Sequence, residues 1–365
     1  MKVGAGLLRI LLLALASLSL LVSACGPEAE DDPKMAKQGI EQSELIILSA
    51  PASGDDYYAE LRDEITAFQI DFARRIIQAG DDVVILADQA ASGEFTSAIG
   101  KEYVLIEGQL DIWARDFGSA NPEAPILFGY TAEGQGGGRT GQREAQAVQE
   151  QLVLLLDKAG IKRREPDLLN DGGNFVEDGA GRAVISRKFL RDNRLSESTA
   201  REILQDGLGL SDIAFIEADE QGGLEHSDGV AAFLEPGLLV INSYPDDPDY
   251  ARALRRDLAL ALPNVRIHEI AAPYDGSQVY DERFGSACGL YTNMLVTPHR
   301  IYLPQFGIAQ DEQALATIRE LTDKQVIPVP SGAICQMGGG VRCMSWQLRG
   351  EAAARLRNYI RVEQF

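Results

Sequence analysis

Five short segments with polar or reactive side chains, four of them containing glycine, recur along this 365-residue chain at similar intervals. They are DIWARDFG (111–118), NDGGNFVEDGAG (170–181), EHSDGV (225–230), LYTNML (290–295) and GGGVRCMS (338–345). The gaps between their markers are 62, 50, 65 and 50 residues, counted from Asp116 through Asp178, Asp228 and Asn293 to Cys343. Regular spacing of this kind is typical of folds built from repeated units around an axis. It predicts repeated strand, strand, helix, strand units that each send one loop to a common centre.

Apolar residues alternate between strand-like and helix-like patterns. The runs ELIILSA (44–50) and DDVVILA (81–87) flank residues 57–79, in which apolar side chains recur at helical spacing. Several later strands follow one another too closely for a helical crossover, so they must pair as antiparallel hairpins. The clearest is NMLVTPHRIYLP (293–304), with its turn at Thr297. The pattern predicts an α/β protein and disfavours a simple doubly wound parallel sheet.

The first residues have the pattern of a secretory signal peptide. Residues 1–24 contain two basic residues and an apolar run, and they end in Ser23 and Ala24 before Cys25. This ending resembles the lipobox of bacterial lipoproteins, in which the cysteine is lipidated and becomes the new N-terminus. We therefore expect a lipid-anchored protein of the bacterial cell envelope that contacts the membrane only through its N-terminal lipid.

The rest of the chain divides into a tether and one domain. Residues 25–43 are polar and acidic and predict a flexible tether. No second linker interrupts residues 44–365, which we expect to form a single catalytic domain. Without the signal peptide, the chain has 32 Lys and Arg against 55 Asp and Glu, a net charge of −23. That charge argues against nucleic-acid binding and suits a cationic partner, while the sequence leaves open whether the chain forms an oligomer.

His226 is the histidine with a reactive neighbour. The other two, His268 and His299, lie in a predicted strand and in a predicted turn, and both are expected to be structural or exposed. Asp228 follows His226 by two residues, which places both side chains on one face of an extended strand. Such a pair can be a structural hydrogen bond, part of a metal site, or a general acid and base. The metal interpretation lacks further ligands at metal-site spacing, and the acid–base interpretation needs a nucleophile elsewhere.

Cys343 is the candidate nucleophile. The glycines at 338–340 allow close backbone approach to a ligand, and Arg342 would lower the pKa of the thiol if its side chain turned inward. The alternative is a disulfide with Cys335, eight residues earlier. With the lipobox cysteine assigned to lipid, Cys288, Cys335 and Cys343 remain, so at least one thiol is unpaired or pairs between chains.

Two segments contain candidate ligand-binding groups. Trp113 and Asp116 lie close together in DIWARDFG, where they form either a surface turn or a holder for a flat cation, with the ring for stacking and the carboxylate for hydrogen bonds. Asp171, Asn174 and Asp178 lie in a glycine-rich segment whose pattern alone fits either a calcium loop or an ordinary bend.

Together, these segments resemble the agmatine deiminase and bacterial peptidylarginine deiminase family, a branch of the guanidine-modifying pentein superfamily. The resemblance runs in order from about residue 44 to 365 and rests on WARDFG, DGGNFVEDGAG, EHSDGV, YTNMLVTPHRIYLPQFG and GGGVRC. It implies a five-bladed pseudo-symmetric α/β propeller with its active site on the axis. It also implies a guanidine iminohydrolase that acts on agmatine, arginine or an arginine-containing peptide and requires no metal or organic cofactor.

The resemblance also assigns roles by position. Cys343 matches the nucleophile, His226 the general acid and base, and Asp116 and Asp228 the carboxylates that hold the guanidinium. The candidate substrate-binding residues are Asn174, Asp178 and Asn293 from the matched motifs, with Trp113 and Gly340 added for their ring face and close approach. A free Cys343 would permit a disulfide between Cys288 and Cys335, or two further thiols. One position departs from the pattern, because Arg342 stands where many members have His.

The implied reaction is covalent. The thiolate adds to the guanidinium carbon, the histidine protonates the departing nitrogen, and water hydrolyses the resulting thiouronium to a ureido product such as carbamoylputrescine or citrulline. Two alternatives remain open at this point. The chain could be a non-catalytic envelope lipoprotein that binds a cationic guanidine, or an amidinotransferase that passes the same intermediate to an amine.

Overall fold

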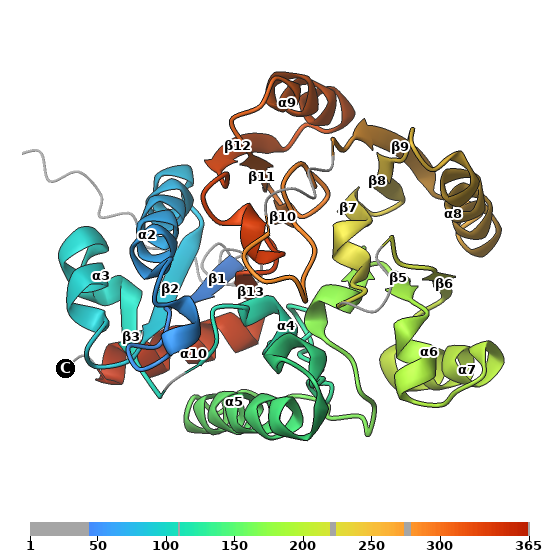
Figure 1. Ribbon diagram of the computed structural model, residues 1–365. Helices are drawn as coiled ribbons and strands as arrows, with labels where there is room; N and C mark the ends of the chain where they lie inside the picture. The colour runs from blue at the N-terminus through green and yellow to red at the C-terminus, as the bar shows by residue number, and fades with distance from the viewer. Residues whose placement is uncertain (1–43, 109, 220–223, 274–278, 364–365) are drawn as a thin grey trace, which may run out of the picture.

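The computed structural model describes residues 44–363, apart from residue 109 and the segments 220–223 and 274–278. The signal peptide, lipidation site Cys25 and tether predicted from the sequence lie outside the described residues. Within the described part, four small sheets surround a common centre, and helices lie on the outside (Figure 1). The chain is therefore a mixed α/β protein with several small sheets.

Three of the sheets share one plan. In each, the first two strands are antiparallel and the third is parallel to the second. The strands are β4 (Val176–Glu177), β5 (Arg182–Ser186) and β6 (Asp212–Ile216); β7 (Ala231–Glu235), β8 (Leu238–Ser243) and β9 (Arg266–Ala271); and β10 (Leu295–Val296), β11 (Arg300–Gln305) and β12 (Gln325–Pro330). Parallel neighbours need a crossover. Helices supply it in each sheet: α6 (Lys188–Asp192) with α7 (Glu197–Leu208), α8 (Pro248–Ala261) and α9 (Gln310–Leu321).

The fourth sheet joins strands from both ends of the described chain. Its order is β13 (Ser345–Arg349), β1 (Glu44–Ser49), β2 (Asp82–Ala87) and β3 (Val104–Ile106). Strand β13 is antiparallel to β1, while β1 and β2 are parallel and are connected by α2 (Arg62–Ala79). Helices α3 (Ser92–Ile99) and α10 (Gly350–Glu363) follow β2 and β13. Strand β13 begins two residues after Cys343, so this sheet fixes the position of that cysteine.

Residues 114–170 follow the same order without forming a named sheet. They contain α4 (Ala114–Phe117) and α5 (Gly138–Lys158). Ala120 and Ile126 form an antiparallel bridge before α5, and Ile126 and Arg164 form a parallel bridge across it. The segment therefore repeats the pairing pattern of the sheets with single bridges in place of strands.

The predicted hairpin and helix are confirmed. Strands β10 and β11 pair in antiparallel register, with Leu295 opposite Tyr302, and the backbone N–H of Thr297 donates to the carbonyl of Arg300 over 2.8 Å at the turn. Helix α2 buries Phe72 and Ile76 from its regular apolar face in the core cluster shared with β1 and β2. It ends at Gly80, whose φ of 85° is the left-handed conformation that commonly terminates a helix.

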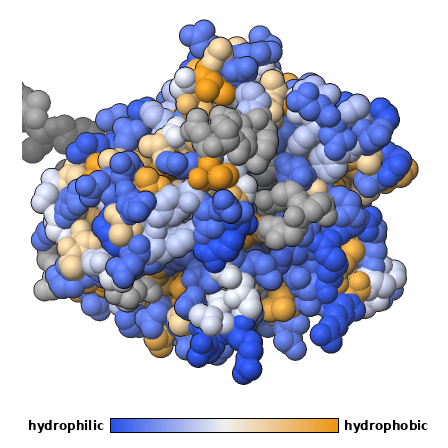
Figure 2. Space-filling view, in the orientation of Figure 1, coloured by the Kyte–Doolittle hydropathy of each residue, from blue (hydrophilic) through white to orange (hydrophobic). Residues whose placement is uncertain are grey.

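The surface reflects the acidic composition. Figure 2 shows hydrophilic residues over most of the face in view, with hydrophobic residues in small separate groups. A net charge of −21 for the whole sequence favours such a solvated surface. Across the described ranges, no helix combines the length and apolar character needed to cross a membrane.

Candidate active site

A cavity of about 830 Å³ is lined by residues from separate stretches of the chain between Ala52 and Cys343. Its charged lining is mostly acidic. Among the described lining residues, one arginine, Arg283, is accompanied by the carboxylates Asp55, Asp56, Asp111, Asp116 and Glu144. A concave site with this balance favours a cationic ligand.

Cys343 lines this cavity from the turn before β13, and it is the free cysteine among those described. Its side chain is buried. Asn293 Nδ2 donates to Cys343 Sγ over 3.0 Å, while Asn293 Oδ1 accepts from the backbone N–H of Cys343 over 3.4 Å. Asp228 Oδ2 lies 3.9 Å from the same sulfur. Three of the segments singled out in the sequence therefore meet at one thiol.

The surroundings of Cys343 disfavour its thiolate form. Burial raises the pKa of Cys343 well above its ordinary value, and Asp228 and Asp116 raise it further. The Arg342 guanidinium donates to Asp228 Oδ2 over 3.0 Å. Burial and the two carboxylates dominate the pKa of the Cys343 thiol, and a bound cation would favour the thiolate.

His226 lies directly before η5 (Ser227–Gly229), with both ring nitrogens facing carboxylates. Its Nε2 is 3.0 Å from Asp171 Oδ2, and its Nδ1 is 3.6 Å from Asp116 Oδ1. Burial disfavours the imidazolium, but Asp116 and Asp171 outweigh it and raise the pKa of His226 to about 9. At neutral pH, His226 is therefore protonated and able to donate a proton.

Asp171 is the functional residue whose role the sequence left open. The backbone N–H and the hydroxyl of Thr131 donate to Asp171 over 2.8 and 2.7 Å, which fixes the carboxylate that contacts His226. Burial alone would raise the pKa of Asp171, but His226 and Lys188 outweigh burial and lower it. The sequence feature that could have pointed to Asp171 is its place directly before Gly172 and Gly173.

Asp228 does not form the side-by-side pair with His226 that the i, i+2 argument predicted. The backbone enters η5 directly after His226, so the two side chains leave a helical turn and not an extended strand. His226 contacts Asp171, whereas Asp228 faces the thiol of Cys343.

Asp116 lies between His226 and the cavity, which it lines. Burial, together with Asp171 and Asp228, outweighs the effect of His226 and raises the pKa of Asp116 to about 7. A bound cation would favour the ionised carboxylate. Gly173 makes the grouping possible, because a Cβ there would lie 2.5 Å from His226 Nδ1 and 2.7 Å from Asp116 Oδ1.

Trp113 forms a flat wall of the cavity beside Asp116 and Cys343. Its ring packs directly on the backbone of Gly339, where an added Cβ would lie 2.2 Å from the ring atom Cζ3. The close approach predicted for the triple glycine is therefore made by Gly339 to the tryptophan. A ring face beside a carboxylate is suited to a planar cation.

Asn174 and Asp178 do not reach the cavity, contrary to the expectation from the sequence. Asn174 Oδ1 accepts from the backbone N–H of Ser186 over 2.8 Å, and Asn174 Nδ2 donates to Asn170 over 3.0 Å. Asp178 accepts from Arg182 over 2.8 Å and lines a second cavity of about 480 Å³. Both side chains are used to hold the loop around the β4–β5 turn.

Gly340 lies behind the cavity and not along it. An added Cβ would lie 3.1 Å from Asn293 Oδ1, so the glycine leaves room for the amide that contacts the thiol. Met337 and Gly338 line the cavity in its place. The residues brought to the cavity itself are therefore Cys343, Asp116 and Trp113, with His226, Asp228 and Asn293 directly behind.

Arg283 carries the positive charge of the lining, and its guanidinium already has a partner. Its Nε donates to Asp281 Oδ2 over 2.9 Å, and the group lies 5.4 Å from the ring centroid of Phe284. A ligand carboxylate would have to compete with Asp281 for this group. With Arg283 already paired, the carboxylates of the lining favour a positively charged ligand.

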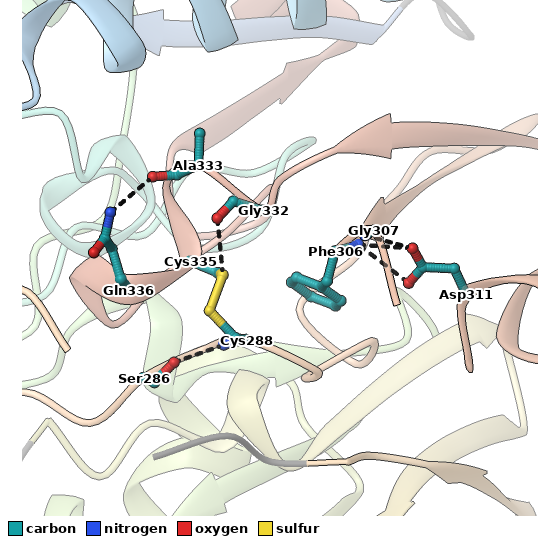
Figure 3. Close-up of a disulfide and its surroundings, with 9 residues drawn as sticks. All are labelled: Ser286, Cys288, Phe306, Gly307, Asp311, Gly332, Ala333, Cys335 and Gln336. Carbon is teal, nitrogen blue, oxygen red and sulfur yellow. Dashed lines mark hydrogen bonds between the residues drawn. A yellow bond between two sulfur atoms is a disulfide. The ribbon is translucent and has the colours of Figure 1, made fainter. Parts of the chain in front are cut away.

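A disulfide joins Cys288 to Cys335 (Figure 3), two residues before Met337 of the cavity lining. It excludes the Cys335–Cys343 pair considered from the sequence. The backbone N–H of Ala287 also donates to the carbonyl of Cys335 over 2.9 Å. The bond therefore ties the segment that carries Asn293 to the segment that carries Cys343.

Removal of this disulfide is expected to lower stability and activity together. The bridged residues are 47 positions apart, a loop whose closure entropy corresponds to about 4 kcal/mol of unfolding free energy. Urea unfolding of the Cys288→Ser/Cys335→Ser variant should show this loss, and turnover should fall because Asn293 is no longer held against Cys343. A loss under about 1 kcal/mol with unchanged turnover would contradict the prediction.

Metal ions in proteins are held by groups of ligating side chains such as His, Cys, Asp and Glu. Over the described residues, no group of three or more His, Cys, Asp and Glu side chains is arranged to hold a metal ion. The carboxylates around His226 are instead paired with its ring nitrogens.

A family of known proteins matches most of the chain. The model of the Porphyromonas-type peptidyl-arginine deiminase family matches residues 35–348. The agmatine deiminase of Stutzerimonas stutzeri (strain A1501) is 27% identical over 238 residues, which cover 56% of this chain and 63% of that protein.

Solved structures show the same fold. Agmatine deiminase of C. jejuni superposes with a TM-score of 0.70 at 19% identity, covering 85% of this chain and 94% of that chain. A second C. jejuni structure, with a cysteine replaced by serine and substrate bound, superposes with a TM-score of 0.66 at 18% identity over the same shares.

Proposed function

The chain belongs to the Porphyromonas-type peptidyl-arginine deiminase family. On this premise we propose that it is a guanidine deiminase, a hydrolase that replaces one guanidinium nitrogen by oxygen and releases ammonia. One observation carries the proposal: a free thiol, an imidazolium and two carboxylates meet at one acidic cavity. Cys343, His226, Asp116 and Asp228 come from three separate segments, so the fold builds this grouping.

The carboxylates supply the binding of the guanidinium. A guanidinium is planar, with N–H donors in a fixed geometry that carboxylate oxygens match. Asp116 and Asp228 flank the thiol of Cys343, and the ring of Trp113 offers the adjacent flat surface. Binding between them holds the guanidinium carbon within reach of the sulfur.

The first half-reaction forms a covalent intermediate. The charge of the bound substrate lowers the pKa of Cys343, and the thiol releases its proton to solvent. The thiolate adds to the guanidinium carbon, and the bond to one amino group breaks. His226 gives its proton to that nitrogen, which leaves as ammonia. A cationic thiouronium on Cys343 and a neutral His226 remain.

The second half-reaction consumes water. Neutral His226 takes one proton from the water, whose oxygen adds to the thiouronium carbon. The carbon–sulfur bond then breaks and leaves a neutral ureido product. The second water proton restores the thiol of Cys343, and His226 is again an imidazolium held by Asp171.

The cavity favours agmatine over substrates with an α-carboxylate. Asp55, Asp56 and Glu144 line it together with Asp111. A second amine would find several partners among these groups. For a carboxylate, the one cationic side chain among the described lining residues is Arg283, which is paired with Asp281. The C. jejuni and S. stutzeri relatives carry the name agmatine deiminase, which supports the same choice.

A panel of guanidines tests this proposal. Ammonia and ureido product should form from agmatine with a kcat/KM at least about tenfold above that for free arginine or a peptide with C-terminal arginine, which corresponds to about 1.4 kcal/mol. Product masses with and without an added amine separate hydrolysis from amidino transfer. Guanidine binding without product after many hours would instead identify a binding lipoprotein.

The finer architecture proposed here is a five-bladed pseudo-symmetric α/β propeller. Four blades correspond to the four sheets. Residues 114–170, with the bridges of Ile126 to Ala120 and Arg164 on either side of α5, supply the fifth. The pairing of β13 with β1 supports ring closure between the two ends of the chain.

The proposed location is the bacterial cell envelope, with a lipid on Cys25. The disulfide between Cys288 and Cys335 supports an oxidising compartment. Mass spectrometry of the mature N-terminus should find a diacylglyceryl group on Cys25. An unmodified chain that retains residues 1–24 would overturn this part of the proposal.

A further inference from the structure

Arg342 binds Asp228, one of the two carboxylates proposed to bind the substrate. Its Nη1 donates to Asp228 Oδ2 over 3.0 Å, and its Nη2 donates to the carbonyl of Phe175 over 3.2 Å. The same Asp228 oxygen is the one 3.9 Å from Cys343 Sγ. A guanidinium of the protein itself thus binds Asp228 where a substrate guanidinium is also proposed to bind.

The two guanidinium groups approach from different cavities. Arg342 and Arg115 line the second cavity of about 480 Å³, whereas their neighbours Cys343 and Asp116 line the substrate cavity. Among the residues that the structure describes, none lines both cavities. Asp228 is only 1% exposed, so it is enclosed in the layer between them.

Arg342 is fixed at its backbone as well. Its N–H donates to the carbonyl of Asn293 over 3.1 Å and approaches Asn293 Oδ1 at 3.2 Å. Asn293 in turn donates to Cys343 Sγ. Arg342 therefore links Asn293, which contacts the sulfur, to Asp228. The hydrogen bonds of its side chain to Asp228 and Phe175 hold the guanidinium in place.

The charges around Cys343 favour a cation beside Asp228. Asp228 is buried beside a thiol that must ionise, and a buried carboxylate without a partner disfavours a second negative charge nearby. The other charged groups around the pair come from α4, β4 and the two loops that face them: Arg115, Asp116, Glu177, Asp171 and His226. Of the cations among them, His226 is engaged with Asp116 and Asp171. Arg115 donates to Gln347 Oε1 over 2.9 Å. The direct ion pair of Asp228 is therefore with Arg342.

We propose that Arg342 is a positioning residue that holds one oxygen of Asp228, neutralises that carboxylate beside Cys343, and leaves its other oxygen for the substrate. The part of this inference that concerns the substrate rests on the proposed function. The part that concerns the thiol does not, because alkylation of Cys343, which lines the cavity, is measured without any substrate.

The test compares Arg342→Met with Arg342→Lys. Without the cation, the pH profile of Cys343 alkylation by iodoacetamide should move up by about one pH unit, which is about tenfold slower alkylation at a fixed pH below the thiol pKa. With agmatine, kcat should fall about 100-fold in Arg342→Met while KM stays level or falls, because the substrate becomes the counter-ion of Asp228. Lysine should recover most of both losses, since it keeps the charge.

Arg349→Met is the matched control. Arg349 lines the same second cavity and pairs with a carboxylate, Glu44, over 2.8 Å, but it does not contact the thiol or Asp228. This variant should keep the alkylation profile of the wild type. An unshifted profile in Arg342→Met, or a lysine variant no better than methionine, would overturn the inference. If wild type converts no guanidine, the proposed function fails while the alkylation profiles still decide the role of Arg342.

Discussion

Cys343→Ala is expected to release no measurable ammonia from agmatine, a loss of about 10⁶-fold in kcat by comparison with nucleophile removal in other covalent hydrolases. The physical reason is that the thiouronium cannot form. The remaining carboxylates still bind and orient the guanidinium, but no other described cysteine is free to replace the nucleophile. Coupled measurement of ammonia and ureido product gives the rate.

Cys343→Ser is the matched control for folding and binding. Its hydroxyl preserves a hydrogen bond to Asn293, whose amide donates to position 343 in the wild type. We expect this variant to bind agmatine with an affinity within about tenfold of the wild-type KM, by calorimetry, without turning it over. Substantial ammonia release by Cys343→Ala would place the nucleophile elsewhere and sink the proposed mechanism.

His226→Asn is expected to lower kcat about 1,000-fold, within the range for loss of a general acid and base. It should also change the pH profile. In the wild type, we expect activity to rise as Asp116 ionises around its pKa of about 7 and to fall as His226 loses its proton around its pKa of about 9. The sign follows from the roles, since the carboxylate acts when charged and the imidazolium when protonated. The variant should lose the alkaline limb.

His268→Asn provides the comparison for this prediction. His268 lies on β9, opposite Val240 and away from the cavity lining. Its replacement should leave the rate and both limbs of the profile unchanged. If His226→Asn kept an alkaline limb near pH 9, another group would have to supply the proton to the leaving nitrogen.

Much of the architecture follows from local patterns. The hairpin at β10–β11 and the helix α2 are encoded by residues close in sequence, so periodicity and turn residues suffice to predict them. Strand β13 was missed because it pairs with β1 from the opposite end of the chain. Such a pairing has no local signal.

The site shows the same division. The order and residue types of the five segments pointed to Cys343 and His226. Thiol and imidazole side chains have characteristic chemistry, so their positions in the sequence mark them as candidate catalytic residues. The partners could not be assigned in this way. Asp171, and not Asp228, binds His226, since the backbone turns into η5 between the two candidates.

The sequence by itself determined the repeated α/β plan, the acidic character and the set of reactive residues. The tertiary structure decided which of them meet: Asn174 and Asp178 are used in a loop, and Cys335 pairs with Cys288. It also placed Arg342 on Asp228, on the far side from the substrate cavity. The physical reason is that the disulfide, the Asp171–His226 contact and the Asp228–Arg342 ion pair join residues 47, 55 and 114 positions apart. Those residues come within reach only once the sheets have packed around their centre.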